Sequence, residues 1–297
     1  MPRTLLAAAI QMDAVPAPTA ERLLRAERLV AQAAAAGAQL AVLPEVFNTG
    51  YAYTEENFAR AEALDGPTAA WMKAAAARHR LHLAGSLMLR DEGEVYNTQL
   101  LFAPDGRIWR YDKNHPFAWE RASFRGRAGV AVAETDLGAI GMLVCIDVIY
   151  TQLWKQYAGR VDLVIVSSCP PDAGHPTYSF PDGQQVTLKG MGRAFASMEN
   201  AVQRAFDEML PLQSAWLGVP VVHAAGCGDF CSPIPNSRGY FLGLALTAPK
   251  LFRYIKQSGR IKLACQIYPA TCIRDASGRS LAAPAAGGDA VILAAVD

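Results

Sequence analysis

Three side chains with complementary chemistry follow short apolar segments that the sequence predicts as strands. Glu45 follows "LAVLP", Lys113 follows "RIWRYD" and Cys145 follows "GMLV". A thiol becomes a nucleophile when a base removes its proton, and a carboxylate can be that base. An ammonium group can stabilise the oxyanion that forms after attack. Because ligands of α/β folds meet the protein at strand ends, these residues form a chemically complete set for acyl transfer.

Cys145 taken alone has a plainer interpretation. Free cysteine is among the most buried residue types, so "GMLVCIDVIY" by itself favours a thiol that fills the core. A carboxylate and an ammonium at two other predicted strand ends keep the alternative open, in which Cys145 is a nucleophile.

The apolar pattern predicts the elements that must position these residues. Residues 4–12 are predicted as a strand. Residues 19–36 have apolar side chains at helical spacing, with Thr19 as the N-cap candidate and Gly37 as the stop signal. A second helix is predicted with Pro67 in its first turn.

Further along, strands and hairpins lead to each reactive residue. A buried strand ends at Glu45, a hairpin with a Pro-Asp-Gly turn leads to Lys113, and a hairpin over 130–145 ends at Cys145. The helix followed by "AGAQLAVLPE" resembles the later helix followed by "AGRVDLVIVSS". This weak repeat fits two sheets with helices outside them. No low-complexity linker divides the chain, so one domain is predicted over 1–297.

Two segments depart from this regular pattern. Residues 170–211 begin with several prolines and have a helical pattern after about Leu188. They are predicted as an irregular rim or lid over the pocket, the alternative being a remote surface excursion. Residues 239–262 are predicted as an insertion with a helix that begins at Pro249 and ends at Gly259. Its apolar face could be buried against the sandwich or a second subunit, could line the pocket, or could dock on an anionic membrane. We expect a homodimer or higher homo-oligomer in which this segment is largely buried.

Composition excludes several classes of protein. The 297 residues carry 28 Lys+Arg against 27 Asp+Glu, so no basic surface for nucleic acid is expected. No apolar run of about 18 residues predicts a membrane span, export is not expected, and the predicted location is the cytoplasm with all six cysteines as thiols. The spacing of Cys227 and Cys231 lacks a second ligand pair, and the histidines are scattered, so neither a metal nor another cofactor is expected.

The segments "LPEVFNTGY", "YDKNHPFAWE" and "GMLVCIDVIY" resemble, in order and separation, the three motifs of the nitrilase superfamily of carbon–nitrogen hydrolases. From Glu45 to Lys113 is 68 residues, and from there to Cys145 is 32. The likeness extends from Ala8 to about Ser167 and resumes at "LGVPVVHAAG" and "IRDASGRSLA". It implies an α/β fold, a four-layer α-β-β-α sandwich of two mixed β-sheets with outer helices.

The resemblance also implies roles. Glu45 would be the general base, Lys113 would stabilise the tetrahedral intermediate, and Cys145 would attack. The backbone N–H of Ile146 would complete the oxyanion hole. Glu120 occupies the place of a second family glutamate, the alternative being a solvated loop acid.

Other assignments are less specific. Phe47, Tyr51 and Trp119 could line the pocket or pack in the core. His115 is expected to orient the lysine loop. Asp147 matches the acid of amidase-like members and is expected near the substrate, although Ile146 replaces the usual aromatic residue. Residues 149–152 also depart from the family pattern, which leaves the substrate open.

The leading hypothesis is a thiol-dependent hydrolase, of the amidase-like branch, that cleaves a non-peptide C–N bond. A small or medium carboxamide would form a Cys145 acyl-enzyme and release ammonia or an amine. Nitrile hydrolysis or acyl transfer to an amine could use the same site. A catalytically silent scaffold is the alternative from another class.

Overall fold

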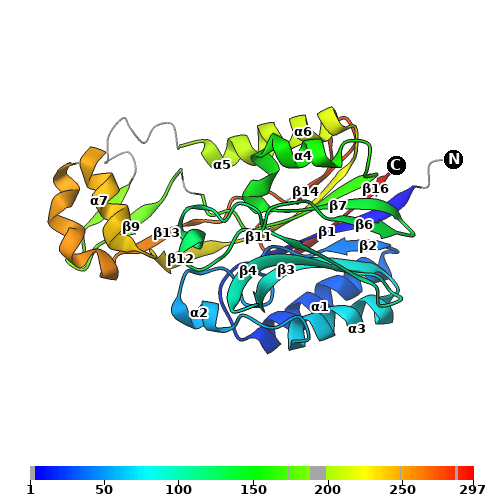
Figure 1. Ribbon diagram of the computed structural model, residues 1–297, viewed down its shortest axis with the longest axis horizontal. Coiled ribbons are helices and arrows are strands. Elements are labelled where there is room, and N and C mark those ends of the chain that lie inside the picture. Colours follow the sequence, from blue (N-terminus) through cyan, green and yellow to red (C-terminus); the bar gives the residue numbers. More distant parts are fainter. Residues whose placement is uncertain (1–3, 173, 188–198, 248, 285–286) are drawn as a thin grey trace.

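Two β-sheets are stacked face to face between two layers of helices (Figure 1). The computed structural model describes residues 4–172, 174–187, 199–247, 249–284 and 287–297. Both sheets mix parallel and antiparallel pairs, and the expected four-layer sandwich is confirmed.

The first sheet has the order β5-β4-β3-β2-β1, and the last strand of the chain adds to β1 in antiparallel orientation. Its strands are β1 (Leu5–Asp13), β2 (Leu40–Val42), β3 (His82–Asp91), β4 (Glu94–Phe102), β5 (Ile108–Asp112) and β16 (Ala290–Val296). The short strand β2 is buried on both sides, which agrees with its continuous apolar sequence.

The second sheet has the order β11-β8-β7-β6, and a hairpin of two short strands extends it from β11. Its strands are β6 (Val132–Thr135), β7 (Gly138–Val144), β8 (Leu163–Ser168), β11 (Val221–Cys227), β14 (Cys272–Arg274) and β15 (Ser280–Ala282). The two sheets meet where Met12 and Asp13 of β1 pair with Gly226 and Cys227. This junction holds the carboxyl ends of β1 and β11 side by side.

Helices cover the outer face of each sheet (Figure 1). The first sheet is covered by α1 (Thr19–Ala35) and α3 (Pro67–His79), and the second by α4 (Thr151–Tyr157) and α6 (Leu210–Leu217). Helix α1 buries Ala26, Leu29, Val30 and Ala33 at helical spacing. It ends as predicted at Gly37, which has a φ of 89°. The N-cap is Pro18 and not Thr19, which is already helical.

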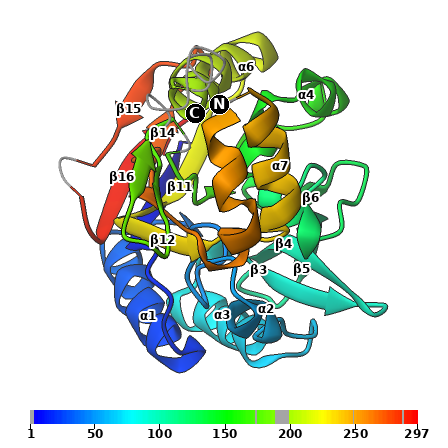
Figure 2. The same cartoon turned by 90° about the vertical axis from the view of Figure 1, so that its left-hand side faces the viewer.

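A smaller four-stranded sheet lies at one end of the sandwich (Figures 1 and 2). Its strands are β9 (Thr177–Ser179), β10 (Gln185–Thr187), β12 (Asp229–Pro233) and β13 (Lys262–Gln266). Along the chain, β12 is followed by helix α7 (Ser237–Thr247), the 3-10 helix η6 (Pro249–Arg260) and then β13. The two helices lie side by side.

This small sheet links the two segments that depart from the regular sequence pattern, 170–211 and 239–262. Strand β9 pairs with β13 in antiparallel register, so part of 170–211 pairs with the strand that begins where the 239–262 region ends. The expectation of an irregular start to 170–211 was therefore wrong for the strands β9 and β10. The helical pattern expected after about Leu188 agrees with the helical turns α5 (Ala201–Gln203) and η5 (Arg204–Met209). Residues 173 and 188–198 lie outside the described part of the chain.

The helix expected from Pro249 to Gly259 is present as η6, but with 3-10 geometry. Within α7 and η6, Ala245 and Tyr254 are buried, whereas Leu242, Leu246 and Phe252 are exposed in the single chain. No helix in the described ranges combines the length and the apolar character needed to cross a bilayer.

Candidate active site

Glu45 lies three residues after β2, in a turn at the edge between the sheets, and its side chain is fully buried. Its Oε1 accepts hydrogen bonds from Asn97 Nδ2 at 2.7 Å and from Lys113 Nζ at 2.8 Å. Its Oε2 accepts from the backbone N–H of Cys169 at 2.8 Å, just beyond β8. The carboxylate is therefore fixed by groups from both sheets.

Lys113 directly follows β5 and is completely buried. Its ammonium donates to Glu45 Oε1 and, at 2.6 Å, to Glu120 Oε2. A buried charge is tolerated only when it is paired and hydrogen-bonded, and here one ammonium is held by two carboxylates. An ammonium has three donors, so one remains for a further acceptor.

Glu120 lies in the short 3-10 helix η1 (Ala118–Ala122) and is also completely buried. Besides Lys113, it accepts from the backbone N–H of Phe117 at 2.6 Å and from the hydroxyl of Tyr51 at 2.7 Å. The alternative of a solvated loop acid is therefore wrong.

Cys145 is the first residue of the 3-10 helix η2 (Cys145–Ile149), immediately after β7. Its φ is 49°, in the left-handed region that non-glycine residues rarely adopt. Such strain persists where the surrounding structure enforces it, often at functional sites. The sharp turn ends β7 at the thiol and begins a helical turn in which N–H groups lack intrahelical partners.

Burial raises the pKa of the Cys145 thiol well above its usual value, and the negative charge of Glu45 adds to this effect. Lys113 acts in the opposite direction. Burial also raises the pKa of Glu45, against the opposing charge of Lys113. Burial alone would lower the pKa of Lys113, but the two carboxylates raise it well above normal. The resting site therefore holds a protonated thiol beside a carboxylate of increased proton affinity.

Asp147 is hydrogen-bonded within the protein through both carboxylate oxygens. It is fully buried, and its Oδ1 accepts from the backbone N–H and ring Nδ1 of His115 at 3.0 and 2.8 Å. Its Oδ2 accepts from the Tyr111 hydroxyl and the backbone N–H of Asn114. Asp147 therefore fixes the loop that follows Lys113, and the expected contact with substrate stays a prediction.

The aromatic candidates separate into different places. Phe47 is completely buried and packs its ring 5.8 Å from that of Trp71, so it belongs to the core and not to the pocket. Tyr51 does line a cavity, together with Cys145. The side chain of Trp119 lies outside the described part of the structure.

Two contributors were missed by the sequence reasoning. Asn97 and the backbone N–H of Cys169 both bind Glu45. The signal for Asn97 was its place at the start of the polar run "NTQ" inside the predicted strand "VYNTQLLF". A backbone donor such as Cys169 leaves no trace in side-chain patterns.

The thiol opens into a small cavity of about 150 Å³. Ile146 and Phe117 form part of its wall, and Pro170 and Pro171 another part after β8. The remaining wall comes from Ala201, Val202, Ala205 and Phe206. The cavity is therefore lined by the turns and loops that follow strands of both sheets and by the helical turns that precede α6.

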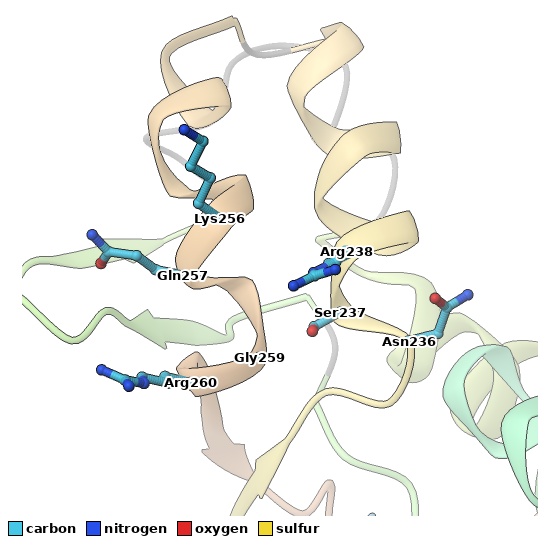
Figure 3. A pocket seen from close by; sticks show the side chains of 7 residues that line it. All are labelled: Asn236, Ser237, Arg238, Lys256, Gln257, Gly259 and Arg260. Carbon is cyan, nitrogen blue, oxygen red and sulfur yellow. The ribbon is translucent and has the colours of Figure 1, made fainter.

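A much larger hollow of about 710 Å³ lies between α7 and η6 (Figure 3). Arg238 points from α7 toward η6, whereas Gln257 and Arg260 point away from α7. The described lining holds neither a carboxylate nor a thiol. The hollow therefore lacks a base and a nucleophile, so the smaller cavity is the candidate active site.

Among the residues that the structure describes, no group of three or more His, Cys, Asp or Glu side chains is placed to hold a metal ion.

Comparison with known proteins places the chain in a family. The sequence model described as carbon-nitrogen hydrolase matches residues 6–297. A nitrilase from Pyrococcus abyssi is 32% identical over 127 residues, which cover 41% of this chain and 48% of the relative. The chain thus matches about half the length of that relative.

Two further proteins extend the comparison. A deaminated glutathione amidase from Synechocystis is 32% identical over 202 residues, covering 62% of this chain and 71% of the relative. The crystal structure of an amidase from Nesterenkonia sp. superposes with a TM-score of 0.70 at 18% identity, covering 99% of this chain and 91% of that one. That similarity shows a shared fold.

Proposed function

Since this chain belongs to the carbon–nitrogen hydrolase family, we propose that it hydrolyses a small or medium carboxamide through a Cys145 acyl-enzyme. The observation that carries the proposal is the buried cluster of Glu45, Lys113 and Glu120 beside a buried thiol. The transfer of these charged groups from water into the protein interior costs free energy. A catalytic role accounts for a cluster that stability alone does not favour.

In the proposed first step, the Cys145 sulfur attacks the amide carbonyl while Glu45 accepts the thiol proton. The carbonyl oxygen becomes an oxyanion that receives the free donor of Lys113 and the backbone N–H of Ile146. Glu45 then gives its proton to the leaving nitrogen, which departs as ammonia or an amine. The C–N bond is broken and a thioester remains.

In the second step, Glu45 accepts a proton from water, and the hydroxide attacks the thioester. The intermediate collapses to the acid, and the proton returns to Cys145. Glu120 holds Lys113 in place during both steps, so it acts as a positioning residue. Asp147 supports the same lysine from the loop beyond it.

A panel of amides and nitriles, read by ammonia release, tests the proposal. We expect turnover of at least one carboxamide and a covalent acyl adduct on Cys145 by mass spectrometry. Turnover of nitriles alone would favour the nitrilase reaction, and hydroxamate formation with hydroxylamine would reveal acyl transfer to an amine. Ammonia from no compound and no adduct would favour the silent scaffold.

We further propose that the chain is one domain in which 170–211 forms a pocket wall. The segment leaves and rejoins the sandwich at the cavity, through Pro170 and Pro171 at one end and residues 201–206 at the other. Shortening the β9–β10 hairpin should change substrate preference more than the Tm. Unchanged kinetics on every substrate would reject this role.

A homo-oligomer is also proposed. Leu212 and Trp216 lie one turn apart on α6 and are 68% and 55% exposed in the single chain. Exposed apolar side chains that gather on one helix face often meet a partner. Light scattering at micromolar concentration should give more than one chain per particle, and a monomer would refute the proposal.

The proposed location is the cytoplasm. All six cysteines are free thiols in the structure, which suits a reducing compartment. Fractionation of cells that express the protein should recover it with cytoplasmic markers.

A further inference from the structure

The walls of the cavity at Cys145 are almost entirely hydrocarbon. Of the described residues that line it, none carries a charged side chain. The hydroxyl of Tyr51 is a polar group there, but it already donates to Glu120 and lies 3.2 Å from the hydroxyl of Tyr53. The lining side chains therefore offer a substrate little beyond the reacting groups to hydrogen-bond.

We propose that this cavity takes an uncharged hydrocarbon acyl group of up to about six carbon atoms and rejects acyl groups that carry a carboxylate. The inference rests on the amidase function proposed above and specifies its substrate class. An apolar cavity of about 150 Å³ is the size that accommodates benzene. A carboxylate moved into such walls would lose its water without gaining a partner, which is strongly unfavourable.

One wall packs against the second sheet. Ala205 and Phe206 belong to the π-helical turn η5, a geometry often found at functional sites. The Phe206 ring stacks on the buried ring of His223, 5.2 Å between centroids, and His223 is hydrogen-bonded to Ser168. Burial lowers the pKa of His223 to about 3, so this support is uncharged near neutral pH. The wall is thus apolar and backed by an uncharged buried side chain of the second sheet, and we expect it to limit the length of the acyl group.

The first experiment measures kcat/KM for ammonia release from a series of straight-chain amides, from acetamide to octanamide. We expect a rise of about threefold to fourfold per added methylene up to about six carbons, followed by a fall. The monoamide of glutaric acid should react at least about 100-fold more slowly than valeramide, which has the same number of carbons.

Paired variants then test the wall. Val202 lines the cavity and is half-buried, whereas the neighbouring Gln203 is exposed. Val202→Arg should raise the ratio of glutaric monoamide to valeramide turnover at least tenfold, because it places a cation in the wall. Gln203→Arg adds the same charge outside the cavity and should leave the ratio unchanged. Ala205→Leu should lower the ratio of hexanamide to acetamide turnover at least tenfold.

The outcomes separate this inference from the proposed function. Faster turnover of the glutaric monoamide than of valeramide would overturn the inference while leaving the amidase function intact. The inference would also be overturned if the length of the acyl chain had no effect on kcat/KM. It would be overturned as well if Gln203→Arg changed the ratio of glutaric monoamide to valeramide turnover as much as Val202→Arg. Absence of ammonia and of a Cys145 adduct with every amide would overturn both.

Discussion

The two cavities of this protein differ in size and in electrostatic character. The hollow between α7 and η6 has a volume of about 710 Å³ against about 150 Å³ for the cavity at Cys145. The larger one is lined by exposed cations, whereas the smaller one lies beside charges that are completely buried. The proposed active site is therefore chosen by its buried charges and not by the available volume.

The physical reason is the surrounding medium. Water and salt screen exposed charges such as those of Arg238, Lys256 and Arg260. Around Lys113 the effective dielectric is lower, so each carboxylate acts strongly on the ammonium and on the thiol. The small cavity can therefore shift proton affinities: burial raises the pKa values of Glu45 and Cys145, and the two carboxylates raise the pKa of Lys113.

The largest expected effect is that of Cys145→Ala. It should lower kcat/KM by roughly 10³-fold or more, because the covalent route is removed. The Tm should change little, since the side chain is small. Cys231→Ala, which alters an exposed thiol, is the matched control and should leave turnover unchanged. Retention of most activity in Cys145→Ala would show that the small cavity is not the reaction site.

The next effect is that of Glu120→Gln, for which we expect a loss of roughly 10- to 100-fold in kcat. The substitution keeps the shape but removes one of the two anions that hold Lys113. Glu94→Gln breaks an exposed ion pair with Arg125 and serves as the control. Circular dichroism must show both variants folded at the assay temperature. Equal activity of the two variants would contradict a role for Glu120 in positioning Lys113.

A smaller effect concerns pH. Glu45 works as a base only when deprotonated, so kcat/KM should fall about tenfold per unit as pH drops below its pKa. That pKa is raised by burial, and the hydrogen bond from Asn97 opposes the rise. Asn97→Leu removes this bond, which raises the pKa further, so the acid limb should move to higher pH.

Gln99→Leu provides the control for that shift. Gln99 lies on the same strand and also loses a buried hydrogen bond, to Ser167, but it does not contact Glu45. Its pH profile should match that of the unaltered protein. If the two variants shift the acid limb equally, Asn97 does not tune Glu45.

The smallest effect is expected at the large hollow. Replacing Arg238, Lys256 and Arg260 together by Ala should change kcat/KM by less than about twofold, because screened charges at a distant site act weakly on the reaction. Amide hydrolysis at fixed substrate concentration, repeated at low and high salt, is the measurement. A tenfold loss would mean that the hollow takes part in the function.

The amino-acid sequence by itself was enough to propose the reactive residues and to predict the elements next to them. A short apolar segment precedes each of Glu45, Lys113 and Cys145. In the structure Glu45 and Lys113 are in direct contact, and the charges of both act on the pKa of the Cys145 thiol. The helix from Thr19 and its end at Gly37 were also predictable. These features depend on local periodicity and turn residues, which the sequence shows directly.

Only the tertiary structure decided what surrounds those residues. The burial of Glu120, the binding of Asp147 to the loop after Lys113, and the place of Phe47 in the core could not be read from neighbouring letters. The pairing of β9 with β13 joins segments about 85 residues apart. Local patterns indicate whether a side chain faces inward, but its partners depend on long-range packing. For a buried polar group those partners decide whether it catalyses, positions or only packs.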